Sequence, residues 1–162
     1  MSSQNIARYV PADTGLSFWG PGDRYTFLVT GEESGGTMFA LDCVVGPGGG
    51  PPPHRHLAED ELFYIFDGTI SFTAGEETRT ISAGESVFVP RGTPHGYRNV
   101  GESETRMIAV YTPAGMEGWF LEVCTPVEDP AAPPPPVTPE LIERMLEAGP
   151  RYSIEWLEDD PS

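Results

Sequence analysis

The chain has 162 residues, 38% of them hydrophobic, which suits one compact domain with a buried core. Nine basic residues against 25 acidic ones give a net charge of -16, which argues against nucleic acid or an anionic membrane surface as a partner. The first ten residues lack the apolar segment of a signal peptide and no apolar run is long enough to span a bilayer, so we expect a cytoplasmic protein.

The first part of the chain alternates short segments of β character with Gly- and Pro-rich turns. Residues 16–19 and 25–29 flank a Pro-Gly-Asp turn, and residues 31–36 are expected to form a loop. Residues 37–45 carry apolar side chains at both alternating sets of positions, which is typical of a strand in a two-layered β structure. Cys43 and Cys124 lack a Cys-x-x-Cys pattern and are expected to be reduced, packed thiols.

Three histidines, the only ones in the chain, predict a metal site. Residues 46–53 are too rich in proline for a central strand and lead as a loop to His54. His54 and His56 have strand spacing and project from one face, while Glu61 follows a short acidic turn that contains the solvated carboxylates of Glu59 and Asp60. His95 follows a second turn rich in Pro and Gly. A lone histidine is more often structural, but this set indicates ligands.

The donor set restricts the metal. Three imidazoles and a carboxylate suit one divalent first-row transition ion, Fe, Mn, Ni, Co or Zn, and do not suit Ca or Mg. The residues leave the choice among these ions open.

Further strands are predicted after Glu61 at close spacing. They cover residues 62–66, 69–73, 78–81, 87–90 and 105–112, with Gly-containing turns between several of them. Many short strands indicate an all-β sandwich or barrel, and the spacing does not choose between the two.

The last part of the chain differs from the rest. Residues 126–136 form a Pro-rich linker, and Thr138 caps a short helix at 139–148 that ends at Gly149-Pro150. Residues 151–157 alternate as in an added edge strand. The helix is too short to be stable alone and should pack on the β structure or on a second subunit. We expect a homodimer, because the N-terminal segments and the tail with Trp156 would otherwise leave open edges.

Two gapped motifs resemble those of the cupin family. The first is matched by Gly48, His54, His56, Glu61 and Gly68. The second is matched by Gly84, Pro90, Gly92, His95 and Asn99. The resemblance implies a jelly-roll-type β-barrel at 1–125, with His54, His56, Glu61 and His95 on its inner wall as metal ligands, and a tail at 126–162 that packs on the barrel.

Within the cupins, the chain most resembles the small quercetin 2,3-dioxygenase-like proteins. This implies a dioxygenase that acts on an enolic or aromatic small molecule, with Glu61 as both ligand and general base. The candidate side chains for an apolar substrate pocket are Phe39, Phe63, Phe72, Tyr97 and Met107. A metal-dependent isomerase or lyase, and a non-catalytic small-molecule-binding cupin, are the alternatives.

Overall fold

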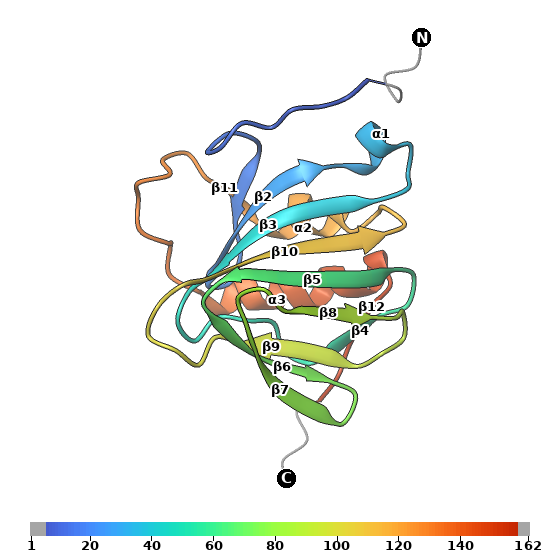
Figure 1. Cartoon of the computed structure of the whole chain (residues 1–162), viewed down its shortest axis with the longest axis vertical. Helices are drawn as coiled ribbons and strands as arrows, with labels where there is room; N and C mark the ends of the chain where they lie inside the picture. Colours follow the sequence, from blue (N-terminus) through green and yellow to red (C-terminus); the bar gives the residue numbers. More distant parts are fainter. Residues whose placement is uncertain (1–5, 159–162) are drawn as a thin grey trace.

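The computed structural model describes residues 6–158, which form two antiparallel sheets; in Figure 1, β9, β6 and β7 of the smaller sheet are seen below the strands of the larger one. The seven-stranded sheet has the order β11 (Thr125–Pro126), β1 (Ser17–Trp19), β2 (Asp23–Val29), β3 (Phe39–Val45), β10 (Thr105–Thr112), β5 (Asp60–Asp67), β8 (Ser86–Val89). The five-stranded sheet has the order β12 (Ile154–Trp156), β4 (His54–His56), β9 (His95–Arg98), β6 (Thr69–Ala74), β7 (Glu77–Ser82). The predicted all-β fold of jelly-roll type is confirmed, although the two sheets stay separate and do not close into a continuous barrel.

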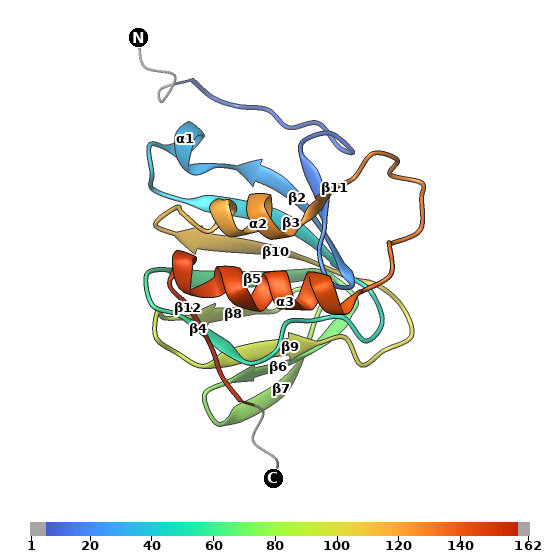
Figure 2. The ribbon, with the colours of Figure 1, turned by 180° about the vertical axis from the view of Figure 1, so that it is seen from behind.

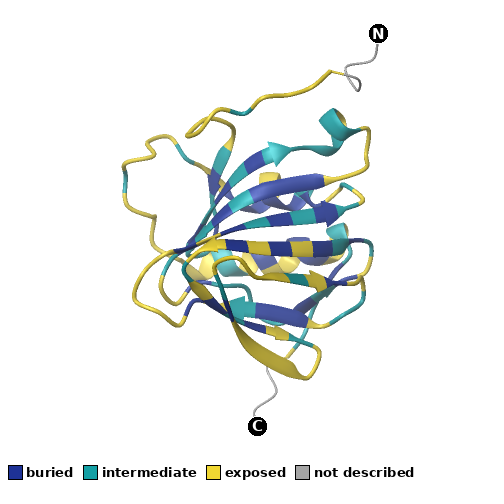
Figure 3. Ribbon diagram, viewed as in Figure 1, coloured by how far each residue is buried: buried dark blue, intermediate teal, exposed yellow. Residues whose placement is uncertain are grey.

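The hydrophobic core lies between the sheets. β10 is central in the larger sheet and pairs with β3 on one side and β5 on the other, so their inward side chains share one face. Leu41, Met107 and Ile65, one from each of these strands, are at most 1% exposed. The alternation of buried and exposed residues along β5 in Figure 3 shows the period of two that sequence alternation predicts for a half-buried strand.

Helices occur at the positions where the strand pattern ends. α1 (Gly31–Ser34) replaces the loop predicted at 31–36, because Thr30 and Glu33 form a capping box. α2 (Glu117–Val123) follows β10, and α3 (Pro139–Ala148) is capped by Thr138 as predicted and continues into the 3-10 helix η2 (Gly149–Tyr152). Among the described helices, none combines the length and apolarity needed to cross a bilayer.

α2 and α3 lie side by side, as the view from behind shows (Figure 2). Phe120 of α2 packs against the aromatic rings of Tyr25, Phe39 and Tyr111, so α2 covers the inner face of the larger sheet. The indole Nε1 of Trp119 donates to the carbonyl of Met145 and ties α3 to α2.

The C-terminal edge strand is confirmed in a shorter form, because residues 149–152 turn as a 3-10 helix first. β12 pairs antiparallel with β4, with Ile154 opposite His56 and Trp156 opposite His54. The last strand of the chain therefore lies directly beside the His-x-His segment.

The glycine-rich loop before β4 is held against the segment that follows β9. The amide of Gly48 donates to the carbonyl of Asn99 at 2.8 Å, and the amide of Asn99 donates to the carbonyl of Gly49 at 2.9 Å. Gly50 has a φ of 134°, and a Cβ there would lie 1.9 Å from the carbonyl oxygen of Tyr97. Only glycine allows this close approach, which brings β4 alongside β9.

Candidate metal centre

Four ligand side chains from both sheets meet at one point. β4 carries His54 and His56, and β9 carries His95, which lies directly opposite His54 in the strand pair. Glu61 comes from β5 of the other sheet. One donor atom from each side chain lies within 4.8 Å of the other three, and all four residues are buried. The structure thus brings together the four residues that the sequence singles out as ligands.

Hydrogen bonds orient two of the imidazole rings. Nδ1 of His54 lies 2.9 Å from the carbonyl oxygen of Pro52, and Nδ1 of His95 lies 2.9 Å from that of Thr93. A carbonyl only accepts, so both Nδ1 atoms carry the proton and both Nε2 atoms keep a free lone pair. These lone pairs are the atoms available to a metal.

The Glu61 carboxylate lies among these nitrogens. Its Oε2 is 2.6 Å from Nε2 of His95, and its Oε1 is 3.5 Å from Nε2 of His56. Oε2 of Glu61 and Nε2 of His95 have no correctly oriented hydrogen-bond partner among the described residues. Buried polar atoms without partners, in a set of three nitrogens and one carboxylate, fit a first-row transition ion.

The protonation states also suit a metal. Burial lowers the pKa of His54 to about 3, and burial likewise lowers the pKa of His56, so both rings are neutral at pH 7. Burial by itself would raise the pKa of Glu61, but its interactions with the adjacent imidazoles of His56 and His95 outweigh burial and lower this pKa to about 2. Burial opposes a charge on His95, yet the adjacent Glu61 carboxylate raises its pKa. The ionised Glu61 and the neutral rings of His54 and His56 are thus in the forms that bind metal, whereas a protonated His95 would release a proton when an ion binds.

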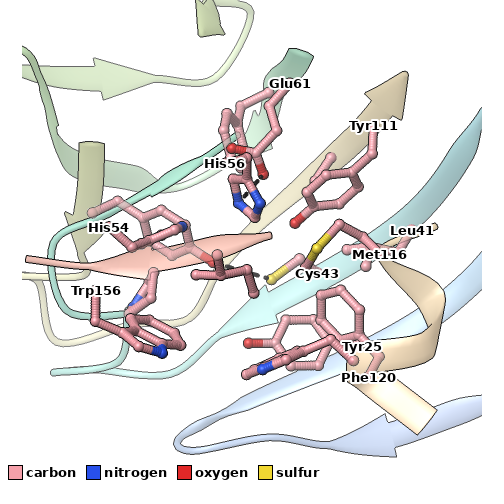
Figure 4. A pocket seen from close by; sticks show the side chains of 16 residues that line it. Tyr25, Leu41, Cys43, His54, His56, Glu61, Tyr111, Met116, Phe120 and Trp156 are labelled. Atoms are coloured by element: carbon pink, nitrogen blue, oxygen red, sulfur yellow. Dashed lines mark hydrogen bonds and ion pairs between the residues drawn. The ribbon is translucent and has the colours of Figure 1, made fainter. Parts of the chain in front are cut away.

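A cavity of about 50 Å³ adjoins the ligand cluster. Its wall is mostly aromatic and aliphatic, and Figure 4 shows several of these side chains around His54, His56 and Glu61. The lining side chains besides the ligands are Tyr25, Leu41, Cys43, Pro51, Phe63, Tyr97, Ala109, Tyr111, Met116, Trp119, Phe120, Ile154 and Trp156. Within residues 6–158, neither Arg nor Lys lines it, and Glu61 is its one carboxylate.

The structure places two of the five predicted pocket residues in the cavity wall and the other three outside it. Phe63 and Tyr97 line the cavity, whereas Phe39, Phe72 and Met107 are buried in the core outside its lining. Phe39 stacks on the ring of Tyr111, at a centroid distance of 5.6 Å. The ring of Phe72 stacks on His95 instead, at 6.3 Å. These two aromatic residues support cavity and ligand side chains from behind.

The pocket prediction missed several cavity residues. Tyr111 is on the same face of β10 as Ala109, so the alternation of that strand could have identified it. Trp119 comes from α2 and Trp156 from β12 near the end of the chain, and no local pattern indicates that they reach the cavity.

One expectation near the ligands is wrong. Glu59, expected to be a solvated carboxylate, is only 6% exposed, and its Oε2 lies 3.7 Å from Nδ1 of His56. Burial raises the pKa of Glu59 to about 7. Its neighbour Asp60 does lie toward solvent, where it pairs with Arg91.

Comparisons with known proteins assign the chain to one family. The cupin domain family matches residues 41–111. Quercetin 2,3-dioxygenase of Bacillus subtilis (strain 168) is 29% identical over 148 residues, which are 86% of this chain and 43% of that relative. Tetracenomycin polyketide synthase protein TcmJ of Streptomyces glaucescens is 30% identical over 112 residues, 68% of this chain and 75% of the relative. The chain thus spans less than half the length of the dioxygenase that it matches.

The crystal structure of an RmlC-like cupin from Shewanella frigidimarina superimposes with a TM-score of 0.60. It shares 19% sequence identity, over 71% of this chain and 98% of that one. This likeness shows the fold.

Proposed function

Because this chain belongs to the cupin family, we propose that it is a metal-dependent enzyme whose cluster of His54, His56, Glu61 and His95 holds one divalent ion, Fe, Mn, Ni, Co or Zn. The nitrogen-rich donor set and the ionised carboxylate support this assignment. When bound, such an ion acidifies a hydroxyl group that coordinates it and, if it is redox-active, supports reaction with dioxygen.

The substrate we propose is a neutral enolic or aromatic small molecule, and the reaction a dioxygenation. The cavity wall carries this proposal, since it offers aromatic surface, including Tyr25, Tyr97 and Tyr111, but no cationic side chain from the described residues. A dicarboxylate or a sugar phosphate would find no Arg or Lys among the described lining residues to pair with its charges beyond the ion. The relative named quercetin 2,3-dioxygenase also supports an oxygen-dependent reaction on a polyphenol.

The size of the cavity narrows the substrate further. Drug-sized ligands occupy pockets of about 300–1,000 Å³, far larger than the 50 Å³ cavity here. A compact, single-ring enol or diketone therefore fits better than a three-ring flavonol, which would enter only after the wall has moved.

We assign Glu61 as the general base that accepts the proton of a substrate hydroxyl group. It is the one carboxylate in the cavity wall of the described chain, and it is ionised at pH 7. A substrate hydroxyl beside it loses its proton to Glu61, while the aromatic wall holds the ring and keeps water out. Tyr111 is directly opposite Glu61 in the β10–β5 pair and also lines the cavity.

The test starts with elemental analysis of protein purified without chelator and without a nickel column. An oxygen electrode then screens cyclic diketones, small enols and flavonols. We expect one ion per chain and oxygen uptake with at least one compact enol. Substrate conversion without oxygen uptake would establish the isomerase or lyase alternative, and binding without any conversion would establish a non-catalytic cupin.

Two variants test the roles of the residues. Glu61→Gln should lower the rate of oxygen uptake by about 10²-fold or more, the usual order for a general base, while part of the metal is retained. The double variant His54→Ala with His56→Ala should lose the metal. Glu104→Gln, an exposed carboxylate, is the matched control. Full activity of Glu61→Gln at full metal occupancy would contradict the role of Glu61.

A further inference from the structure

We propose that Glu59 is a positioning residue that holds His56 in the tautomer and orientation needed for metal binding. The proposal rests on the metal site proposed above. It assigns a role to a carboxylate that lies outside both the ligand cluster and the cavity wall.

The three histidines differ in what their Nδ1 atoms contact. His54 and His95 each have a backbone carbonyl oxygen at 2.9 Å. Nδ1 of His56 has no hydrogen-bond partner in the described part of the chain, although the residue is only 3% exposed. A buried imidazole nitrogen without a partner is costly and calls for an explanation.

The side chain of Glu59 carries the hydrogen-bond acceptor that Nδ1 of His56 lacks. Its Oε2 is also buried and lacks a hydrogen-bond partner within residues 6–158. The two atoms lie 3.7 Å apart, which is too long for a hydrogen bond. A shift of about 0.8 Å would bring them to the usual distance of about 2.9 Å and satisfy both. A buried donor and a buried acceptor that face each other point to a pair that closes when His56 engages a ligand.

The surrounding backbone holds this pair in place. The carbonyl of His56 accepts from the amide of Gly92 at 2.7 Å, so the backbone that carries the ring is anchored. The backbone amide and the guanidinium of Arg91 both bond to Asp60, which directs that carboxylate outward. In the short turn between β4 and β5, Glu59 is thus the acid that turns inward.

The chemical consequence concerns Nε2 of His56. A carboxylate that accepts a hydrogen bond from Nδ1–H keeps the proton on Nδ1, leaves the lone pair on Nε2, 3.5 Å from Glu61, and makes Nε2 more basic. Loss of such a partner typically weakens metal affinity by about 10–100-fold.

The test compares Glu59→Leu, Glu59→Gln and the matched control Glu104→Leu, at an exposed carboxylate, by titration with Co²⁺, followed through the visible absorption of the bound ion. Glu59→Leu should weaken Co²⁺ binding by about 10–100-fold. Glu59→Gln should restore most of the affinity, because its amide oxygen still accepts from Nδ1. Glu104→Leu should match the wild type. Unchanged affinity in a folded Glu59→Leu protein would overturn the proposal.

A second measurement does not depend on the metal or on the variants. Nitrogen-15 NMR of the wild-type histidines reports which ring nitrogen of His56 carries the proton, and a protonated Nδ1 is expected. If the wild type binds no Co²⁺ but Nδ1 of His56 is protonated, the proposed metal site fails while the Glu59–His56 pair stands. An Nε2-protonated His56 would overturn the pairing itself.

Discussion

At the scale of single residues, Asp23 on β2 is a buried carboxylate that the proposed chemistry does not use. It is 2% exposed, and its Oδ2 accepts a hydrogen bond of 3.0 Å from the hydroxyl of Tyr25. Its Oδ1 has no partner among residues 6–158. Burial raises the pKa of Asp23 from 3.8 to about 7, and the bond from Tyr25 only partly opposes this.

This shift predicts a pH-dependent stability. Asp23 is protonated in the folded state at pH 5 but ionised in the unfolded state, so its contribution is fully present below pH 3.8 and is lost as the pH rises to about 7. The loss is at most roughly 4 kcal/mol. Asp23→Asn should remove it and raise the melting temperature relative to the wild type at pH 8 but not at pH 4. Thermal unfolding of both proteins from pH 4 to 9 checks this, and parallel curves would contradict it.

At the scale of elements, β12 closes the cavity over the candidate metal centre. Its pairing with β4 places the ring of Trp156 at 5.4 Å from that of His54. The indole Nε1 of Trp156 donates to the carbonyl of Leu146, so α3 holds this side chain against the cavity. A segment from the end of the chain therefore limits the space beside the ligands.

Trp156→Ala should enlarge the cavity and favour larger ligands. We expect the affinity for a three-ring flavonol to rise by roughly tenfold, equivalent to about 1.4 kcal/mol, and the affinity for a compact enol to stay the same or fall. Flavonol fluorescence titration measures this without turnover. Trp19→Ala, on β1 outside the cavity lining, is the control. Equal flavonol affinity in Trp156→Ala and the wild type would show that Trp156 does not limit the site.

At the scale of the whole molecule, the outer face of the larger sheet carries an apolar patch formed by Leu62, Tyr64, Phe66 and Phe88. Their exposed fractions are 42%, 45%, 37% and 62%. Leu62 and Phe88 are direct partners in the β5–β8 pair, so the patch is continuous across two strands. The tail with Trp156, expected to need cover from a second subunit, instead packs within its own chain.

We propose that the expected homodimer forms through this patch, because a flat apolar face can pack against its own copy about a twofold axis. The net charge of -16 makes two copies repel each other, so the dimer should strengthen with added salt. Light scattering at micromolar concentration should give twice the chain mass. Tyr64→Glu with Phe88→Glu should give the monomer mass, and Val100→Glu, at an exposed loop position, should not. A monomeric wild type in 0.5 M salt would refute the proposal.

The residues themselves determined the fold class and the four candidate ligands. Histidine spacing of two, the Pro- and Gly-rich turns and the alternation along 62–66 and 105–112 are local properties, and each survives in the structure as a strand or turn with the expected inward side chains. The helix at 139–148 was equally local, since its Thr138 cap and Pro139 at its first position are adjacent residues. The predicted stop at Gly149-Pro150 was only partly correct, because the chain continues there as the 3-10 helix η2.

Tertiary structure decided the features that depend on distant segments. The cavity wall is completed by α2 and β12, which reach it only through their packing against β2, β3 and β4. Glu59 is inward and Asp60 outward because Arg91, 31 residues further along the chain, holds Asp60. The hydrophobic periodicity of a strand predicts which of its sides is buried. It carries no information about which distant segment covers that side. In this protein, the packing of distant segments sets both the size of the cavity and the partner of His56.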